Sequence, residues 1–107
     1  MKVASLKFSA KKEPPFYDIE INDKGNIRYY NKKGERHRLD GPAVEYPNGE
    51  KEWWVNGKKH RLDGPAAEYA NGNRQWWVDG EQIGTTLGGF TDEDFEKWKK
   101  EHGYENS

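Results

Sequence analysis

The chain has 107 residues, of which 35% are charged and 32% hydrophobic, and its formal net charge is -1. This length fits one domain, and the balanced charge excludes the strongly basic footprint of a duplex-binding protein. The composition also excludes a large aliphatic core, whereas an aromatic content of 14% predicts a thin core of Phe, Trp and Tyr. With no cysteine, a disulfide scaffold and a thiolate metal site are excluded as well.

The N-terminal segment 1–15 is expected to form an arm with a short edge strand at residues 2–8, in which Val3, Leu6 and Phe8 are apolar. The run KKEPP at residues 11–15 ends that strand, because its two prolines lack amide donors. The segment has no apolar region of a secretory signal, and no stretch of the chain approaches transmembrane length. We therefore expect a soluble cytoplasmic protein with no membrane partner.

The middle of the chain is a tandem repeat. Residues 37–59 and 60–82 are identical at 15 of 23 positions. A fixed period of this length is typical of repeat architectures, in which one unit buries its apolar face against the next. Residues 16–36 are a degenerate copy of the unit, and residues 83–107 hold a Gly- and Thr-rich connector and a helix.

The degenerate copy predicts an antiparallel β-hairpin. Ile19 and Ile21 alternate with acidic residues, and the run Asp23-Lys24-Gly25 is a turn signal. Pairing about this turn places Ile21 opposite Ile27 and Ile19 opposite Tyr29. One face of the hairpin is then apolar and the other polar, as expected for a half-buried pair of strands.

The two full copies predict further hairpins about Asn48-Gly49 and Asn71-Gly72, because Asn-Gly favours a two-residue turn. Two-residue loops would place the main apolar residues of all three hairpins on one shared face, and a slip by one residue would reverse every side chain. The predicted pairs are Tyr46 with Lys51, Val44 with Trp53, Pro42 with Val55, Tyr69 with Arg74, Ala67 with Trp76, and Pro65 with Val78.

The linkers between hairpins also repeat, as HRLD at residues 37–40 and 60–63 followed by Gly-Pro. Leu39 and Leu62 are expected to fill the seam between adjacent hairpins. Duplicated His and Asp could suggest metal or acid–base chemistry. However, a residue pattern that recurs in every copy indicates a structural role, and two isolated histidines do not make a zinc site.

After the connector, Thr91 is the expected N-cap of a C-terminal helix, and the acidic residues 92–94 suit its first turn. Phe95 and Trp98 are three residues apart and would share a face. Gly103 suits the C-terminal end, which gives about three turns. We expect this helix to cover the last hairpin, since terminal repeats need a cap.

The run Trp54-Val55-Asn56-Gly57-Lys58-Lys59-His60, followed by Asp63-Gly64 and Asn71-Gly72, resembles the MORN repeat and its variants. The resemblance covers about residues 16–82. It departs from the family pattern after the His, where this chain has Arg and MORN repeats usually have Gly. Short HRxDGPA…EYxNGxxxWWxNG arrays ending in an acidic-led helix also look like proteins from tailed-phage genomes. The MORN resemblance implies successive β-hairpins and a binding or scaffolding role toward proteins.

Together these features predict a mainly β protein with a single domain, residues 1–107. Three MORN-like antiparallel hairpins with a 23-residue period would form a repeat meander, and one C-terminal α-helix would cap it. An open edge of the meander could pair across a homodimer axis.

The Trp-Trp pairs provide candidate contact residues, because neighbours on a strand point to opposite faces. Alternation assigns Trp53 and Trp76 to the core and leaves Trp54, Trp77 and Tyr30 on the other face. One interpretation is an aromatic ladder for a partner, since Trp and Tyr dominate binding hot spots. The alternative is a second packing surface under the N-terminal segment or the helix, and the MORN resemblance likewise implies that Trp54 and Trp77 are structural.

Arg38 and Arg61 form a basic cluster with Lys58 and Lys59 near the linkers. With exposed aromatic rings, such a cluster could bind single-stranded nucleic acid by stacking. Interspersed glutamates instead favour a solvated face of mixed charge.

The sequence contains no phosphate loop, dinucleotide fingerprint, nucleophile elbow or paired-His zinc helix. We therefore expect a non-enzymatic protein-binding module with no cofactor and no metal, whose contact residues are Tyr30, Trp54, Trp77, Arg38 and Arg61. If the chain is phage-encoded, it would bind and block a host defence protein in the host cytoplasm. The alternative is a small-ligand or single-stranded nucleic-acid binder that uses exposed Trp residues as stacking platforms.

Overall fold

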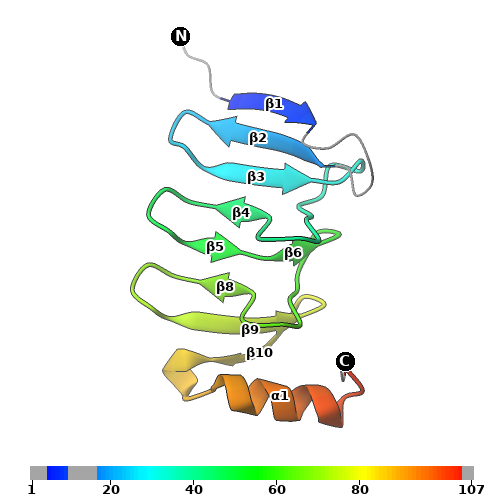
Figure 1. The fold of residues 1–107 in the computed structure, drawn as a ribbon, viewed down its shortest axis with the longest axis vertical. Coiled ribbons are helices and arrows are strands. Elements are labelled where there is room, and N and C mark those ends of the chain that lie inside the picture. The colour runs from blue at the N-terminus through cyan, green and yellow to red at the C-terminus, as the bar shows by residue number, and fades with distance from the viewer. Residues whose placement is uncertain (1–4, 10–16, 105–107) are drawn as a thin grey trace.

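The computed structural model describes residues 17–104 and the backbone of residues 5–9. The chain is mainly β, with an antiparallel meander sheet followed by one C-terminal α-helix (Figure 1). The larger sheet has the order β1-β2-β3-β4-β5-β8-β9-β10, and β6 pairs with β7 in a second, smaller sheet. The shortest extent of the molecule is 17 Å, so the sheet is a single layer over most of its 49 Å length.

The strands are β1 (Ser5–Ser9), β2 (Asp18–Asn22), β3 (Ile27–Tyr30), β4 (Val44–Glu45), β5 (Lys51–Glu52), β6 (Trp54–Val55), β7 (Lys58–Lys59), β8 (Ala67–Glu68), β9 (Arg74–Val78) and β10 (Glu81–Thr85). A 3-10 helix η1 (Thr86–Gly88) precedes the helix α1 (Asp92–Glu101). β1 lies at the edge of the sheet and pairs with β2, and it extends to Ser9, one residue beyond the end of the strand predicted at 2–8. The rest of that predicted strand, residues 2–4, and the predicted strand end at 11–15 lie outside the described residues.

The register predicted for the first hairpin is confirmed. Ile21 lies opposite Ile27, and Ile19 lies opposite Tyr29. The loop has three residues, 23–25, and its last residue, Gly25, has a φ of 88°. This is a type I turn followed by a left-handed residue, which is a common three-residue hairpin connection.

The registers predicted for the next two hairpins are wrong by one residue. Val44 pairs with Glu52 rather than Trp53, and Ala67 pairs with Gln75 rather than Trp76. The reason is loop length: the amide of Tyr46 donates to the Glu50 carbonyl across a loop of residues 47–49, where a two-residue turn was expected. Because the slip is one residue, Val44 and Ala67 face the side of Trp54 and Trp77, and the single shared apolar face is not formed.

Two tighter turns join the remaining strands. Asn56 and Gly57 have φ values of 50° and 82°, and Val55 pairs with Lys58 across them. Asp79 and Gly80 have φ values of 51° and 82° and connect β9 to β10. Positive φ at both central residues defines the type I′ turn, whose twist matches that of paired strands.

Two five-residue segments leave the sheet between paired residues. The carbonyl of Tyr29 accepts a hydrogen bond from the amide of His37, and the amide of Tyr29 donates to the carbonyl of Ala43. The residues between these two partners, 38–42, therefore project from the sheet as the first excursion loop. The second excursion loop (residues 61–65) leaves in the same way at Trp53, where the paired groups are the His60 amide and the Ala66 carbonyl.

The helix α1 closes the β10 end of the sheet (Figure 1). Thr91 is its N-cap as predicted, and it forms a reciprocal capping box with Asp94. At the other end, the amide of Tyr104 donates to the Lys99 carbonyl and Gly103 has a φ of 79°, which is a Schellman ending. The helix therefore begins and ends where the capping residues require.

The best-formed core lies under this helix. Trp76, Val78 and Phe95 have exposed fractions of 0%, 3% and 2%. Partly buried side chains surround them: Leu62, Ile83, Phe90, Trp98 and Tyr104. The helix thus covers the apolar side chains at this end of the sheet.

Candidate functional site

Three of the five predicted contact residues, Tyr30, Trp54 and Trp77, lie half-buried on one face of the sheet. The polar atom of each ring donates a hydrogen bond to a side chain of the same face. The pairs are Tyr30 Oη with Glu20 Oε1 at 3.0 Å, Trp54 Nε1 with Glu52 Oε1 at 2.8 Å, and Trp77 Nε1 with Gln75 Oε1 at 3.0 Å. These hydrogen bonds help to fix the orientation of the three rings.

Cationic side chains lie between the rings. The Lys59 Nζ is 4.7 Å from the centroid of the Trp77 ring and 5.7 Å from that of Trp54, and the Arg36 Cζ is 5.1 Å from the Trp54 centroid. Backbone pairing dictates this order, because Lys59 pairs with Trp54 and Arg36 forms a bridge with Tyr30. We call the sequence Tyr30–Arg36–Trp54–Lys59–Trp77 the aromatic–cation row.

Burial raises the pKa of the Tyr30 hydroxyl, and the hydrogen bond to the Glu20 carboxylate raises it further. Burial also raises the pKa of Tyr69, with the negative charge of Glu52 as the next contribution. Tyr69 donates to Gln75 Oε1 at 3.3 Å, so it lies on the same face as the row. The predicted register had put Tyr69 on the other face, and the one-residue slip explains why sequence reasoning missed it.

Arg61, another predicted contact residue, lies on the opposite face and is held by its own loop. Its Cζ is 3.8 Å above the centroid of the Trp53 ring, its Nε donates to Asp63 at 2.8 Å, and its Nη1 donates to the Pro65 carbonyl at 3.0 Å. Arg38 repeats these contacts with Tyr29 at 4.0 Å, Asp40 at 3.0 Å and the Pro42 carbonyl at 3.2 Å. The five predicted residues are therefore divided between two faces.

The two histidines of the HRLD linkers accept hydrogen bonds from the backbone. His37 Nδ1 accepts from the amide of Asn56 at 2.9 Å, and His60 Nδ1 accepts from the amide of Asp79 at 3.0 Å. An imidazole accepts at Nδ1 only while that nitrogen carries no proton. Burial lowers the pKa of His37, although the negative charge of Glu35 acts in the opposite direction. The lowered pKa favours the neutral imidazole, which can accept at Nδ1. Within the described residues, no three His, Cys, Asp or Glu side chains lie close enough together to hold a metal ion.

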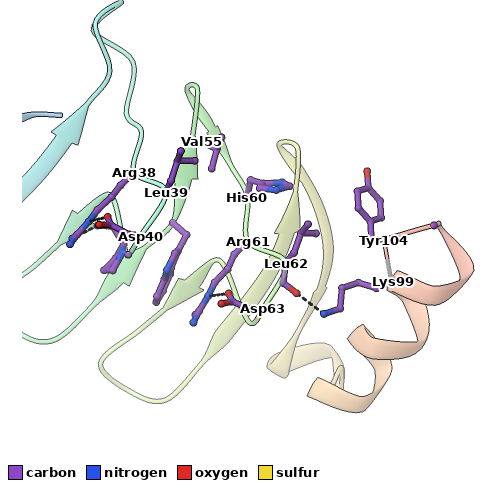
Figure 2. A pocket seen from close by; sticks show the side chains of 14 residues that line it. Arg38, Leu39, Asp40, Val55, His60, Arg61, Leu62, Asp63, Lys99 and Tyr104 are labelled. Atoms are coloured by element: carbon purple, nitrogen blue, oxygen red, sulfur yellow. Dashed lines mark hydrogen bonds and ion pairs between the residues drawn. The ribbon is translucent and has the colours of Figure 1, made fainter. Parts of the chain in front are cut away.

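A groove of about 1100 Å³ lies on the face of the excursion loops. Trp53, Val55 and residues of both excursion loops line it. Lys99 and Tyr104 line it at the helix end (Figure 2). Leu39 borders the groove with 62% of its surface exposed, so the prediction that it fills a seam is wrong. Sequence reasoning missed the groove because the composition of the loops does not reveal which face they cover.

No helix in the described part of the chain has the length and apolarity that crossing a bilayer requires. Comparison of the chain with protein-family models, with curated proteins and with solved structures gives no match.

Proposed function

We propose that the chain is a non-enzymatic protein-binding module, and that the aromatic–cation row is its contact surface. The observation that carries this proposal is the order of the row, in which aromatic rings and cations alternate across one face and hold each other in place. Trp, Tyr and Arg are the residues most enriched in binding hot spots. Rings that are already ordered lose little conformational entropy when a partner covers them.

The shape of the molecule supports a folded partner. The face that bears the row belongs to a body of 49 by 32 Å, which is large enough for the ~800 Å² that each partner buries in a standard interface. The helix packs on the other face, against Trp76 and Val78, and leaves the row uncovered. A partner surface that places carboxylates opposite Arg36 and Lys59 would complement the row electrostatically.

The repeat supports a MORN-like identity for the unit. Residues 37–59 and 60–82 share their sequence and also the arginine and histidine contacts of their linkers. We propose that the hairpins are three copies of one MORN-like unit of 23 residues, the first of them degenerate. The resemblance of these arrays to tailed-phage proteins supports a host protein, such as a defence enzyme, as the partner in the host cytoplasm.

A single-stranded nucleic acid is the rival partner. A base that stacked between Trp54 and Trp77 would have to displace Lys59 from its place beside the two rings. The row therefore favours a protein, whose carboxylates can approach the cation without displacing it.

Affinity capture with the tagged full-length chain tests the proposal. Lys59→Glu reverses a charge inside the row, and Lys58→Glu makes the same change at the exposed neighbour, which pairs with Val55. We expect one host protein to be retained by wild type and by Lys58→Glu, and lost with Lys59→Glu and with Trp54→Ala. The interaction is then measured with the purified partner. Equal retention by all four proteins would show that the row is not the contact, and loss of the retained material on nuclease treatment would favour the nucleic-acid alternative.

A further inference from the structure

The helix α1 packs against one set of side chains in the last repeat copy. Its residue Phe95 forms the core with Trp76 and Val78, and Leu62 and Ile83 pack against that core from the sides. The Lys99 Nζ donates to the Leu62 carbonyl at 2.6 Å. The helix thus contacts a set of apolar side chains on the sheet and loop and one loop carbonyl.

The same four positions recur 23 residues earlier, where no helix of the described chain covers them. Leu39, Trp53, Val55 and His60 correspond to Leu62, Trp76, Val78 and Ile83, and all four border the groove. Burial differs in the direction that a missing cover predicts. Trp53 and Val55 are partly exposed where Trp76 and Val78 are buried, and Leu39 is exposed where Leu62 packs against the core.

We infer that the groove is the binding site for an amphipathic helix of a partner protein. The helix would carry two aromatic side chains three residues apart, with a lysine directly after the second, as α1 carries Phe95, Trp98 and Lys99. This goes beyond the proposed function, because the groove and the aromatic–cation row lie on opposite faces.

The dimensions and polar groups of the groove suit such a helix. A helix about 10 Å wide with a pitch of 5.4 Å occupies roughly 400 Å³ per turn, so about 1100 Å³ corresponds to between two and three turns. The carbonyl of Leu39 is the counterpart of the one that Lys99 reaches. Tyr104 and Lys99 form the wall nearest α1, so the incoming helix would lie beside α1 (Figure 2).

Two differences between the copies make the groove shallower and more polar than the region under α1. Arg61 covers the ring of Trp53, at the place where Phe90 lies against Trp76. His60, which follows the copy at residues 37–59, stands at the position that corresponds to Ile83, which follows the copy at residues 60–82. The partner helix would therefore contact mainly Leu39 and Val55, and it would dissociate more readily than α1 does from its own chain.

A second copy of this chain does not fit as the occupant. Its α1 already buries Phe95 to 2% exposure against its own sheet. An exchange of helices between two copies would return each helix to the positions around Leu62 and Val78, and the groove would remain open. This argument excludes α1 of a second copy, and the proposal commits to a helix from another protein.

The probe is a peptide with the sequence of residues 91–104, labelled with fluorescein at its N-terminus. A lactam between the side chains of Glu93 and Lys97, both exposed on α1, favours the helix, because an isolated peptide of this length is only marginally helical. The control peptide carries Phe95→Ala and Trp98→Ala. Fluorescence anisotropy is recorded as each peptide is titrated with the full-length chain.

Leu39→Glu places a charge in the groove at an exposed position, so the fold should tolerate it. Leu87→Glu is the matched control, since Leu87 is 82% exposed and does not border the groove. Chemical-shift changes in the wild-type chain provide a second measurement that needs no variant. They should centre on the amides of Leu39, Val55 and His60.

We expect saturable binding to wild type and to Leu87→Glu, and binding at least roughly tenfold weaker with Leu39→Glu, because the burial of one leucine side chain corresponds to at least a decade in affinity. The control peptide should not bind. An absence of binding to wild type, equal binding to Leu39→Glu, or shift changes centred on other residues would overturn the proposal. Lys59→Glu should bind the peptide as wild type does, so failure of the groove and failure of the row are distinguishable.

Discussion

Replacement of Arg61 by methionine tests whether the arginines close the excursion loops. The methionine keeps most of the apolar stem above Trp53 but removes the guanidinium, which donates to Asp63, to the Pro65 carbonyl and to Glu68. If this arrangement stabilises the fold, the variant should unfold at a lower urea concentration than wild type does.

The expected loss can be worked out contact by contact. Pro65 is buried, and a buried carbonyl left without a donor costs about 1–3 kcal/mol. The carboxylates of Asp63 and Glu68 are exposed and partly exposed, so the two ion pairs together add about 0–1 kcal/mol. The cation above Trp53 adds ~0.5–1 kcal/mol, since methionine retains part of the packing. The sum is about 1.5–5 kcal/mol.

Equilibrium unfolding in urea measures this loss. With a slope of about 2 kcal/mol per M, the transition midpoint should fall by about 0.8–2.5 M. Lys58→Met makes a similar change at an exposed position and should shift the free energy of unfolding by less than about 0.5 kcal/mol. Arg61→Lys keeps the charge but lacks the planar guanidinium, so its transition midpoint should lie between those of wild type and Arg61→Met. A midpoint for Arg61→Met equal to that of wild type would refute the role assigned to the loop arginines.

Two further predictions concern other contacts. Burial lowers the pKa of His37 below the ordinary value of 6.5. As pH falls, His37 therefore takes up a proton in the unfolded chain before it does so in the folded chain. The free energy of unfolding should then decrease as pH falls below 6.5. Urea titrations at about pH 7.5 and about pH 5.5 should show this decrease in wild type and a smaller one in His37→Gln, whereas greater stability at the lower pH would contradict the assignment. Gly84→Ala would place a Cβ in steric overlap with ring atoms of Phe90 and should cost about 1–3 kcal/mol in thermal unfolding. Gly88→Ala meets only Thr85 Oγ1 at 3.5 Å and should change the melting temperature little, so equal melting temperatures for the two variants would contradict this packing.

The limits of prediction from sequence are clearest in the turns. Asn48-Gly49 and Asn56-Gly57 are the same dipeptide, but only the second forms a type I′ turn. In the first, Gly49 is the left-handed residue that ends a three-residue loop beginning at Pro47. Proline suits the second position of a type I turn, and glycine suits the fourth. The sequence therefore contained the signal, and the strength of Asn-Gly as a two-residue turn obscured it.

The two faces of the Trp-Trp pairs were predictable because alternation along a strand is local. Trp76 is buried and Trp77 lies on the other face beside Lys59, as the count indicates. The faces of Arg38 and Arg61 were not predictable in this way. Both follow the point where the chain leaves the sheet, and no period relates a residue in such a loop to the strands. Only the tertiary path of the loops places their guanidinium groups above Tyr29 and Trp53.

A single-layer sheet can bury aromatic rings only where something covers them, and this chain uses two kinds of cover. Arginines of the excursion loops lie over Tyr29 and Trp53, whereas Phe90 and α1 cover Trp76. A guanidinium retains its charge and its carboxylate partners, so it covers a ring without excluding water, whereas Trp76 and Val78 under the helix are buried. Burial of the equivalent side chains therefore increases from the middle copy (residues 37–59) to the last copy (residues 60–82). A partner helix in the groove would give Val55 and Leu39 the burial that α1 gives Val78 and Leu62, which is the physical reason to expect binding and stabilisation of the middle copy together.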